Sequence, residues 1–170
     1  MSILKNKLGG ACMKMGDNVN SDVIIPGRYL VSIDPQELAK HAFEPLGDDF
    51  QRKLQKTKIL VAGRNFGCGS AREQAASCLI GAGVQAIIAD SFARVFFRNA
   101  INTGLVAIQC PEAVAAVESG DDLYVDMKAG EIQTPKGNFT FPSYPESTMS
   151  ILESGGLIPY VAVQLLKEGK

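Results

Sequence analysis

A glycine-rich stretch, GRNFGCGSAREQAA at residues 63–76, contains the side chains best suited to chemistry in this sequence. An apolar run, KILVA, precedes it, and a helix-like run follows it. A strand, a glycine loop and a helix in this order commonly bind an anion, because free backbone N–H groups point out of the helix start. Arg72 would lie in the first helical turn, where the dipole disfavours a cation unless an anion is near. Since arginine binds carboxylates through two parallel hydrogen bonds, the stretch predicts an anion site.

Two alternatives to a general anion site are a known nucleotide-binding motif and a purely structural helix cap. The stretch matches neither GxxxxGK[ST] nor GxGxxG, because Arg72 stands where the second pattern needs a glycine. Ser70 and Glu73 have the spacing of a capping box, which predicts a helix over about 71–81. Ser70 would then have a structural role, as a helix cap. The two roles are compatible, because a serine fixed at a helix start aims its oxygen at the same anion site.

A second polar cluster lies upstream, in DNVNSDVIIPGRYL. Five polar residues crowd one loop ahead of an apolar anchor: Asp17, Asn18, Asn20, Ser21 and Asp22. An Asx-rich turn is a common structural explanation for such a cluster. The functional alternative is a second wall of the same anion site.

The composition restricts the class of protein. The chain has 170 residues, 46% hydrophobic and 21% charged, which indicates one globular domain. Seventeen basic and eighteen acidic residues give a net charge of −1, and no basic stripe suggests nucleic-acid binding. No apolar run approaches the ~20 residues of a membrane span. The four cysteines form no C-x-x-C pair, which favours free thiols in a reducing cytoplasm.

The pattern of elements predicts an α/β core. A long loop is expected at 16–33, and from Asp121 onward the pattern changes to short antiparallel strands. Strands are expected at 8–15, 58–63, 84–90 and 104–110, and helices at 34–41, 71–81, 91–100, from 111, and at 157–167. Asp34 before Pro35 predicts a capped helix start, and Ser91 is expected to cap the helix after it. Alternating strands and helices imply parallel pairing, so we expect a mixed or parallel core sheet with a smaller β-rich sheet or flap.

Three segments together resemble a known family. GRNFGCGSAREQAA, followed by ADSFARVFFRNAINTGL, resembles the swivel domain of the aconitase superfamily, and DNVNSDVIIPGRYL resembles the other signature of that domain. The set is similar to the small subunits of the isopropylmalate dehydratases, from about Gly9 to Pro111. The resemblance implies a single swivelling β/β/α domain over 1–170, separate from a cluster-bearing large subunit.

The resemblance also implies a reaction and a partner. Such a hydro-lyase removes water from a hydroxy acid and adds it back at the neighbouring carbon, here interconverting 2- and 3-isopropylmalate in leucine biosynthesis. A [4Fe-4S] cluster on the large subunit would bind the leaving hydroxyl, in a heterodimer or heterotetramer. This chain would carry no cofactor. That agrees with its cysteines, which are too scattered along the chain to form the usual cluster motif.

Site residues follow from the resemblance position by position. Ser70 aligns with the serine that takes the carbon-bound proton, and Arg72 with the arginine that binds a substrate carboxylate. Asp22 aligns with an active-site aspartate, and Gly69 belongs to the substrate-binding loop. The stretch Tyr29, Leu30, Val31 and Ser32 aligns with the loop that discriminates the variable group of the substrate. An apolar residue at Val31 suits an isopropyl group, whereas an arginine there accompanies an additional carboxylate.

The sequence departs from the common family pattern GSSREHAP at three places: Ala71, Gln74 and Ala76. These departures leave Ser70 and Arg72 in place, so they bear on the identity of the substrate more than on the type of reaction. Related dehydratases acting on homoaconitate, 2,3-dimethylmalate or citraconate and methylmalate are alternatives. Outside this class, a stand-alone anion-binding α/β module remains an alternative. A hydrolase with Cys68 as nucleophile is weaker, because the single histidine, His41, is expected on another helix.

Overall fold

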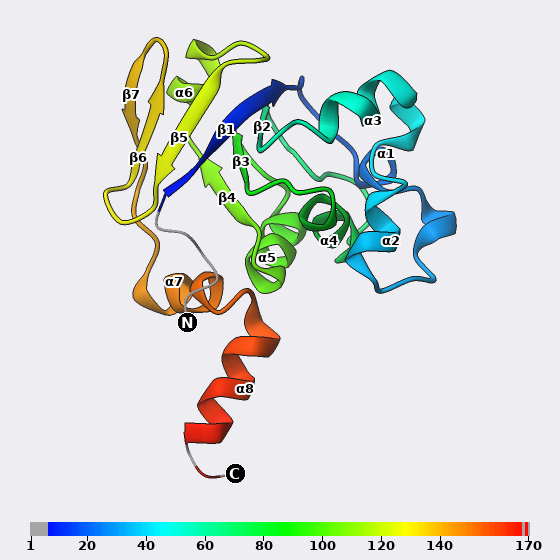
Figure 1. Ribbon diagram of the computed structural model, residues 1–170, viewed down its shortest axis with the longest axis vertical. Coiled ribbons are helices and arrows are strands. Elements are labelled where there is room, and N and C mark those ends of the chain that lie inside the picture. The colour runs from blue at the N-terminus through cyan, green and yellow to red at the C-terminus, as the bar shows by residue number, and fades with distance from the viewer. Residues whose placement is uncertain (1–6, 168, 170) are drawn as a thin grey trace.

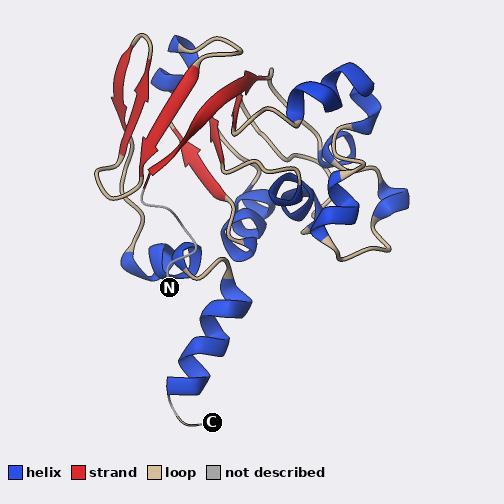
Figure 2. Ribbon diagram, in the orientation of Figure 1, coloured by secondary structure: helices blue, strands red, loops and turns tan. Residues whose placement is uncertain are grey.

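The computed structural model describes residues 7–167 and 169 and contains one mixed sheet of seven strands (Figures 1 and 2). The strands are β1 (Lys7–Lys14), β2 (Ile59–Ala62), β3 (Ala86–Ala89), β4 (Val106–Gln109), β5 (Asp122–Asp126), β6 (Glu131–Thr134) and β7 (Gly137–Thr140). Their order is β4-β3-β2-β1-β5-β6-β7. Strand β1 pairs in parallel with β2 and antiparallel with β5. The antiparallel strands expected as a smaller sheet or flap therefore continue the parallel part through β1, and the predicted α/β class is confirmed.

Helices cover both faces of the parallel strands. They are α1 (Ser21–Ile24), α2 (Pro35–Ala39), α3 (Asp48–Leu54), α4 (Gln74–Gly81), α5 (Arg94–Thr103), α6 (Pro111–Ala116), α7 (Glu146–Glu153) and α8 (Leu157–Lys167), with 3-10 turns at Gly27–Tyr29 and Glu44–Leu46. Leu60 of β2 packs in one core cluster with Leu79 of α4, and Ile59 packs in the other with Val114 of α6. Because β2 is buried on both faces, it reads as an uninterrupted apolar run rather than an alternating one.

The arrangement of the sheet places the two polar motifs at one edge. The loop after β1 carries residues 15–20, and the loop after β2 carries the glycine-rich stretch. Parallel neighbours end at the same edge of a sheet, and open α/β sheets bind ligands beyond the carboxyl ends of their strands. The pairing of β1 with β2 therefore brings the two loops together.

Several element boundaries differ from those expected. The helix predicted from Ser70 begins at Gln74, and the helix predicted from Ser91 begins at Arg94. The expected loop at 16–33 contains α1 and a 3-10 turn, and α3 and α7 were not predicted. The cap at Asp34 is confirmed, since its carboxylate accepts a hydrogen bond of 2.9 Å from the backbone N–H of Gln36.

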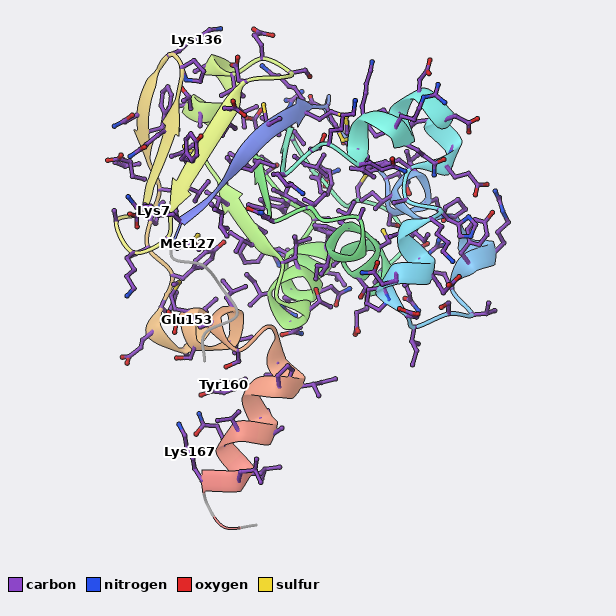
Figure 3. The ribbon with its side chains drawn as sticks, in the orientation of Figure 1. Lys7, Met127, Lys136, Glu153, Tyr160 and Lys167 are labelled. Carbon is purple, nitrogen blue, oxygen red and sulfur yellow. The ribbon has the colours of Figure 1, made fainter. Side chains whose placement is uncertain are left out.

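Helix α8 extends away from the rest of the chain, as Tyr160 and Lys167 show in Figure 3. None of its residues is buried, and Ile158 is 82% exposed. Within the described residues, no single helix has the length and apolar character to span a membrane, and α7 and α8 meet those criteria only as a pair bent by 98°.

Candidate functional site

The two motif loops are joined by backbone hydrogen bonds that extend the pairing of the parallel strands. The backbone N–H of Asn18 donates to the carbonyl of Arg64 at 2.7 Å, and that of Gly67 donates to Val19 at 2.8 Å. Farther along, the N–H of Ser21 donates to the carbonyl of Cys68 at 2.7 Å. The polar cluster and the glycine loop therefore lie side by side, as expected for two walls of one site.

An ion pair fixes the entrance to both loops. The carboxylate of Asp17 accepts hydrogen bonds from the backbone N–H of Arg64 at 2.8 Å and from its Nε and Nη2 at 3.0 and 2.8 Å. The backbone hydrogen bond and then the guanidinium hold the pKa of Asp17 below its usual value. These contacts with Arg64 therefore stabilise the carboxylate form of Asp17.

Two glycines determine the path of the loop before Ser70. Gly67 has φ +77°, and a Cβ there would lie 2.1 Å from the ring of Phe96. Gly69 has φ +88°, and a Cβ there would lie 2.7 Å from Oδ1 of Asn20. Since side chains rarely adopt this backbone region, the loop can follow this path only with glycine at both places.

Ser70 is presented by the loop and not by a helix cap. Its carbonyl accepts a hydrogen bond of 2.8 Å from Oγ of Ser21, whereas no described residue hydrogen-bonds to its own Oγ. Helix α4 begins four residues later without a side-chain cap. The capping-box prediction for Ser70 is therefore wrong, because the carbonyl of Ser70 is bonded to the upstream loop and the helix starts only at Gln74. Ser70 is exposed, so its hydroxyl is accessible to a bound molecule.

Arg72 joins the glycine loop to α1. Its Nη1 lies 2.5 Å from Oδ1 of Asp22 and 3.4 Å from the carbonyl of Ile25. The side chain of Arg72 is 17% exposed and that of Asp22 is 53% exposed. Asn20 caps α1 by accepting from the N–H of Asp22 at 2.8 Å, which places that carboxylate. Among the described residues, Nε and Nη2 of Arg72 have no hydrogen-bond partner, so one edge of the guanidinium can still bind a carboxylate in the bidentate manner.

A small pocket of about 120 Å³ lies between this loop and the start of α5. Ser21, Gly69, Ser70 and Arg72 line it together with Arg94, a residue that sequence reasoning did not single out. Typical ligand pockets measure roughly 300–1,000 Å³, so this one has room for a group about the size of a carboxylate but not for a whole substrate. A larger hollow of about 610 Å³ beside Tyr144 is lined by none of the predicted site residues.

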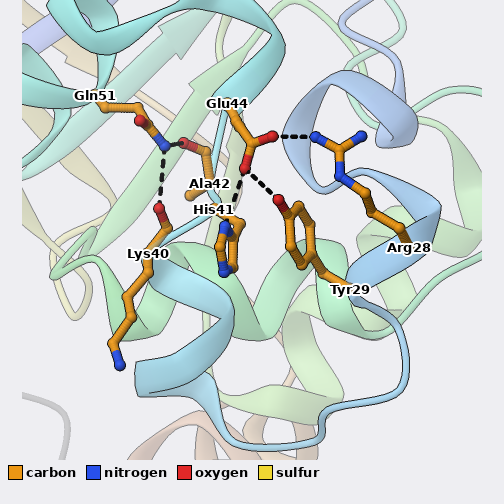
Figure 4. Close-up of polar contacts among 7 residues, drawn as sticks. All are labelled: Arg28, Tyr29, Lys40, His41, Ala42, Glu44 and Gln51. Atoms are coloured by element: carbon orange, nitrogen blue, oxygen red, sulfur yellow. Dashed lines mark hydrogen bonds and ion pairs between the residues drawn. The ribbon is translucent and has the colours of Figure 1, made fainter.

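The predicted specificity loop lies on the surface. Val31 is 94% exposed, and Ser32 accepts a hydrogen bond from the N–H of Asp34 at 3.2 Å. The carbonyl of Leu30 accepts from Nε2 of Gln74 at 3.4 Å, so Gln74 joins this loop to α4. Tyr29 does not share this exposure, because its ring and hydroxyl face His41 and Glu44 (Figure 4). Glu44 was not identified from the sequence, although its spacing of three from His41 was visible there.

The cysteines do not provide a second chemistry. Cys12, Cys78 and Cys110 are buried, and burial raises the pKa of the Cys78 thiol to about 12. The hydrogen bonds and ring stacking of the His41 side chain are with Glu44 and Tyr29, so they provide no base for Cys68. Among residues 7–167 and 169, no group of three or more His, Cys, Asp or Glu side chains is placed to hold a metal ion.

Comparison with known proteins defines the class first. Residues 36–113 match the family model described as the aconitase C-terminal domain. A solved structure of 3-isopropylmalate dehydratase from Methanocaldococcus jannaschii has a TM-score of 0.88 and 38% identity, over 96% of this chain and 98% of that one. The glycine loop and strands β2 to β4 therefore belong to an aconitase C-terminal domain, and the fold as a whole is that of the solved dehydratase.

Sequence relatives make the assignment more specific. The 3-isopropylmalate dehydratase small subunit of Caldicellulosiruptor saccharolyticus is 48% identical over 94% of this chain and 93% of its own length. The 2,3-dimethylmalate dehydratase small subunit of Eubacterium barkeri is 46% identical, over 90% of this chain and 96% of its own length. The chain belongs to the 3-isopropylmalate dehydratase small-subunit family, as its motifs predicted.

Proposed function

We propose that this chain is the small subunit of a hydro-lyase that interconverts 2- and 3-isopropylmalate in leucine biosynthesis. The observation that carries the proposal is the grouping of an exposed Ser70 hydroxyl, a guanidinium edge of Arg72 and one small pocket. The similarity to 3-isopropylmalate dehydratase small subunits supports the substrate.

Arg72 binds one carboxylate of the substrate in this proposal. Asp22 holds Nη1, which fixes the plane of the guanidinium and directs its other edge. A fork held in this way binds a carboxylate at a defined angle, which a flexible lysine would not do. The role of Asp22 toward the substrate is therefore to orient Arg72, in addition to any contact with the large subunit.

Ser70 moves the proton. Loss of water breaks one C–H and the neighbouring C–O bond and leaves a double bond. Ser70, as the alkoxide, takes the proton from carbon and returns it when water is added at the other carbon. Cations close to a serine oxygen favour its charged form, and Arg72 and Arg94 line the same pocket. A [4Fe-4S] cluster on the large subunit supplies the Lewis acid for the departing hydroxyl.

The remainder of the site comes from the large subunit in this proposal. The pocket on this chain is smaller than a whole substrate site, and the apolar side chains of Val31 and Ile33 are 94% and 88% exposed. Closure onto the large subunit and the substrate would cover them. The free state of all four cysteines suits a reducing cytoplasm, which we propose as the location.

A related activity on 2,3-dimethylmalate is the second candidate. The Eubacterium barkeri relative named for that substrate is nearly as similar to this chain as the isopropylmalate relatives are. Val31 suits either substrate, since both carry apolar groups and neither needs a cation at that place.

Reconstitution tests the function directly. The chain is combined anaerobically with its cluster-bearing large subunit and assayed on 2-isopropylmalate, 2,3-dimethylmalate, homoaconitate and 2-methylmalate. We expect the highest kcat/KM on 2-isopropylmalate. A preference for dimethylmalate would support the second candidate, and no turnover of any hydroxy acid would refute both.

A further inference from the structure

The loop between Tyr29 and Asp34 is called the Val31 loop below. At its base, the carboxylate of Glu44 contacts three side chains (Figure 4). Its Oε2 accepts a hydrogen bond of 2.6 Å from the Tyr29 hydroxyl and lies 2.9 Å from Nδ1 of His41. Its Oε1 accepts from the guanidinium of Arg28. We call Tyr29, His41 and Glu44 the carboxylate clamp.

Ring packing strengthens the same cluster. The rings of Tyr29 and His41 stack with centroids 3.6 Å apart and planes 8° from parallel. The guanidinium carbon of Arg28 lies 4.8 Å from the centroid of the Tyr29 ring. Tyr29 is thus held by its hydroxyl and by one face of its ring, which fixes the backbone where the loop begins.

The clamp is attached firmly to the body of the chain. Phe43, next to Glu44, is fully buried, and its N–H donates to the carbonyl of Ile24 at 2.8 Å. Nε2 of Gln51 donates to the carbonyls of Lys40 and Ala42 at 3.2 and 3.1 Å, on both sides of His41. The segment that carries the partners of Tyr29 is therefore attached to α1 and α3.

The clamp itself contributes little to the core, because the side chains of His41 and Glu44 are 34% and 31% exposed. Its position matters for the loop between Tyr29 and Asp34. The far end of that loop is fixed by the cap at Asp34. Its middle is fixed by the contact from Gln74 to the Leu30 carbonyl, by the packing of Leu30 against the core, and by short-range backbone hydrogen bonds. At the near end, the clamp adds side-chain contacts to the turn hydrogen bond from the N–H of Tyr29 to the carbonyl of Pro26.

We propose that Tyr29, His41 and Glu44 are positioning residues that set where Val31 stands against the substrate, and so set the selectivity for its alkyl group. This inference rests on the proposed function. Tyr29 acts through the loop in this account and does not touch the substrate. The role differs from that of Ser70 and Arg72, which none of the three contacts through a hydrogen bond.

Substrate selectivity in the reconstituted enzyme tests the proposal. Tyr29→Phe keeps the ring stacking and removes only the donor, and Glu44→Gln keeps the shape and removes the charge. Glu37→Gln is the matched control, because Glu37 is an exposed carboxylate on the same segment, 2.6 Å from Lys40. Each complex is assayed for kcat and KM on 2-isopropylmalate and on 2-methylmalate, which carries a smaller alkyl group.

The expected result is a loss of discrimination. An added methyl or methylene in an apolar pocket changes kcat/KM by roughly tenfold or more. Tyr29→Phe and Glu44→Gln should therefore lower the isopropyl-to-methyl ratio of kcat/KM by about three- to tenfold, mainly through the KM for isopropylmalate. The control should leave the ratio unchanged. An equal fall on both substrates, or an unchanged ratio in both variants, would overturn the proposal.

Amide hydrogen exchange separates a failure of the clamp from a failure of the proposed function. The N–H groups of Leu30 and Ser32 donate to Gly27 and Tyr29 at 3.2 Å each. In the small subunit alone, these amides should exchange faster in Glu44→Gln than in the wild type or Glu37→Gln. If the wild-type complex does not act on isopropylmalate, the proposed function fails while faster exchange still supports the clamp. Unchanged exchange overturns the clamp whatever the substrate.

Discussion

The glycine loop and the Val31 loop are held in place by different kinds of interaction. Backbone hydrogen bonds to the upstream loop hold the glycine loop and bring Ser70 to the surface. The backbone hydrogen bonds of the Val31 loop stay within the loop and its turn. Its links to the rest of the chain run through side chains: Glu44 at its base, Gln74 at Leu30, and Leu30 packed against the core. Backbone pairing survives most substitutions, whereas a side-chain contact is lost with one. The difference is consistent with the names of two relatives, a 3-isopropylmalate and a 2,3-dimethylmalate dehydratase small subunit.

The largest effect on stability should come from the backbone of the glycine loop. Gly67→Ala adds a methyl that meets the Phe96 ring at 2.1 Å and places a side chain at φ +77°. We expect a loss of roughly 2–4 kcal/mol in the free energy of unfolding, from strain and overpacking together. Urea denaturation measures it.

Gly120→Ala is the control for the backbone term. Gly120 has φ +96°, and a Cβ there would meet nothing within 4 Å. This substitution should lower the free energy of unfolding by only about 1–2 kcal/mol, which is the cost of a positive φ for a residue with a Cβ. Equal losses in the two variants would contradict the close contact with Phe96.

Replacing the guanidinium should weaken substrate binding without unfolding the chain. Arg72→Lys keeps the charge but replaces a fork held by Asp22 with a flexible point charge. We expect KM for 2-isopropylmalate to rise about tenfold or more, because hydrogen bonds to charged groups contribute about 1.5–3 kcal/mol each. Arg52→Lys, at an exposed pair with Asp49, is the control. A KM and a kcat both at the wild-type value would remove Arg72 from the site.

A change in the Val31 loop should alter selectivity and leave stability alone. Val31 is 94% exposed, so Val31→Arg should change the free energy of unfolding by less than about 0.5 kcal/mol. In the reconstituted complex it should lower kcat/KM for 2-isopropylmalate and raise it for homoaconitate, which can pair its extra carboxylate with the new cation. If activity on both substrates stays constant, the loop does not contact the variable group.

The smallest effect concerns pH. Hydrogen bonds from Tyr29 and His41, and the charge of Arg28, hold the pKa of Glu44 below its ordinary value of 4.5. A lowered pKa in the folded chain stabilises the fold above the unfolded value, and this contribution disappears as the pH falls through the folded value. The wild type should therefore melt slightly above Glu44→Gln near neutral pH. A Tm difference that persists unchanged in strong acid would contradict the clamp.

Short-range signals in the sequence predicted much of the fold. The run KILVAG gave β2 because it is apolar throughout, and the helix after Asp34 and Pro35 follows from local capping chemistry. The predicted start of α4 was wrong because the glycine loop before this helix pairs with Val19 and Ser21, which lie far upstream in the sequence. No local pattern reports such a distant contact.

The same limit applies to the site. Ser70, Arg72 and Asp22 could be chosen from motifs, and the structure joins Arg72 to Asp22. Glu44 was not chosen, because its contact with Tyr29 spans fifteen residues, and the neighbouring Phe43 is held by a backbone hydrogen bond to the distant Ile24. Arg94 reaches the pocket through the packing of α5, which the sequence does not specify locally.

The most direct test of the account is the turnover of Ser70→Ala in the reconstituted complex, with Ser147→Ala, at an exposed serine of helix α7, as the control. The account predicts intact assembly with the large subunit and a fall in kcat of about a hundredfold or more, the scale of a lost acid–base group. Arg72 remains in place, so KM should change much less. A kcat close to the wild-type value in Ser70→Ala would contradict the central claim that the glycine loop performs the proton transfer.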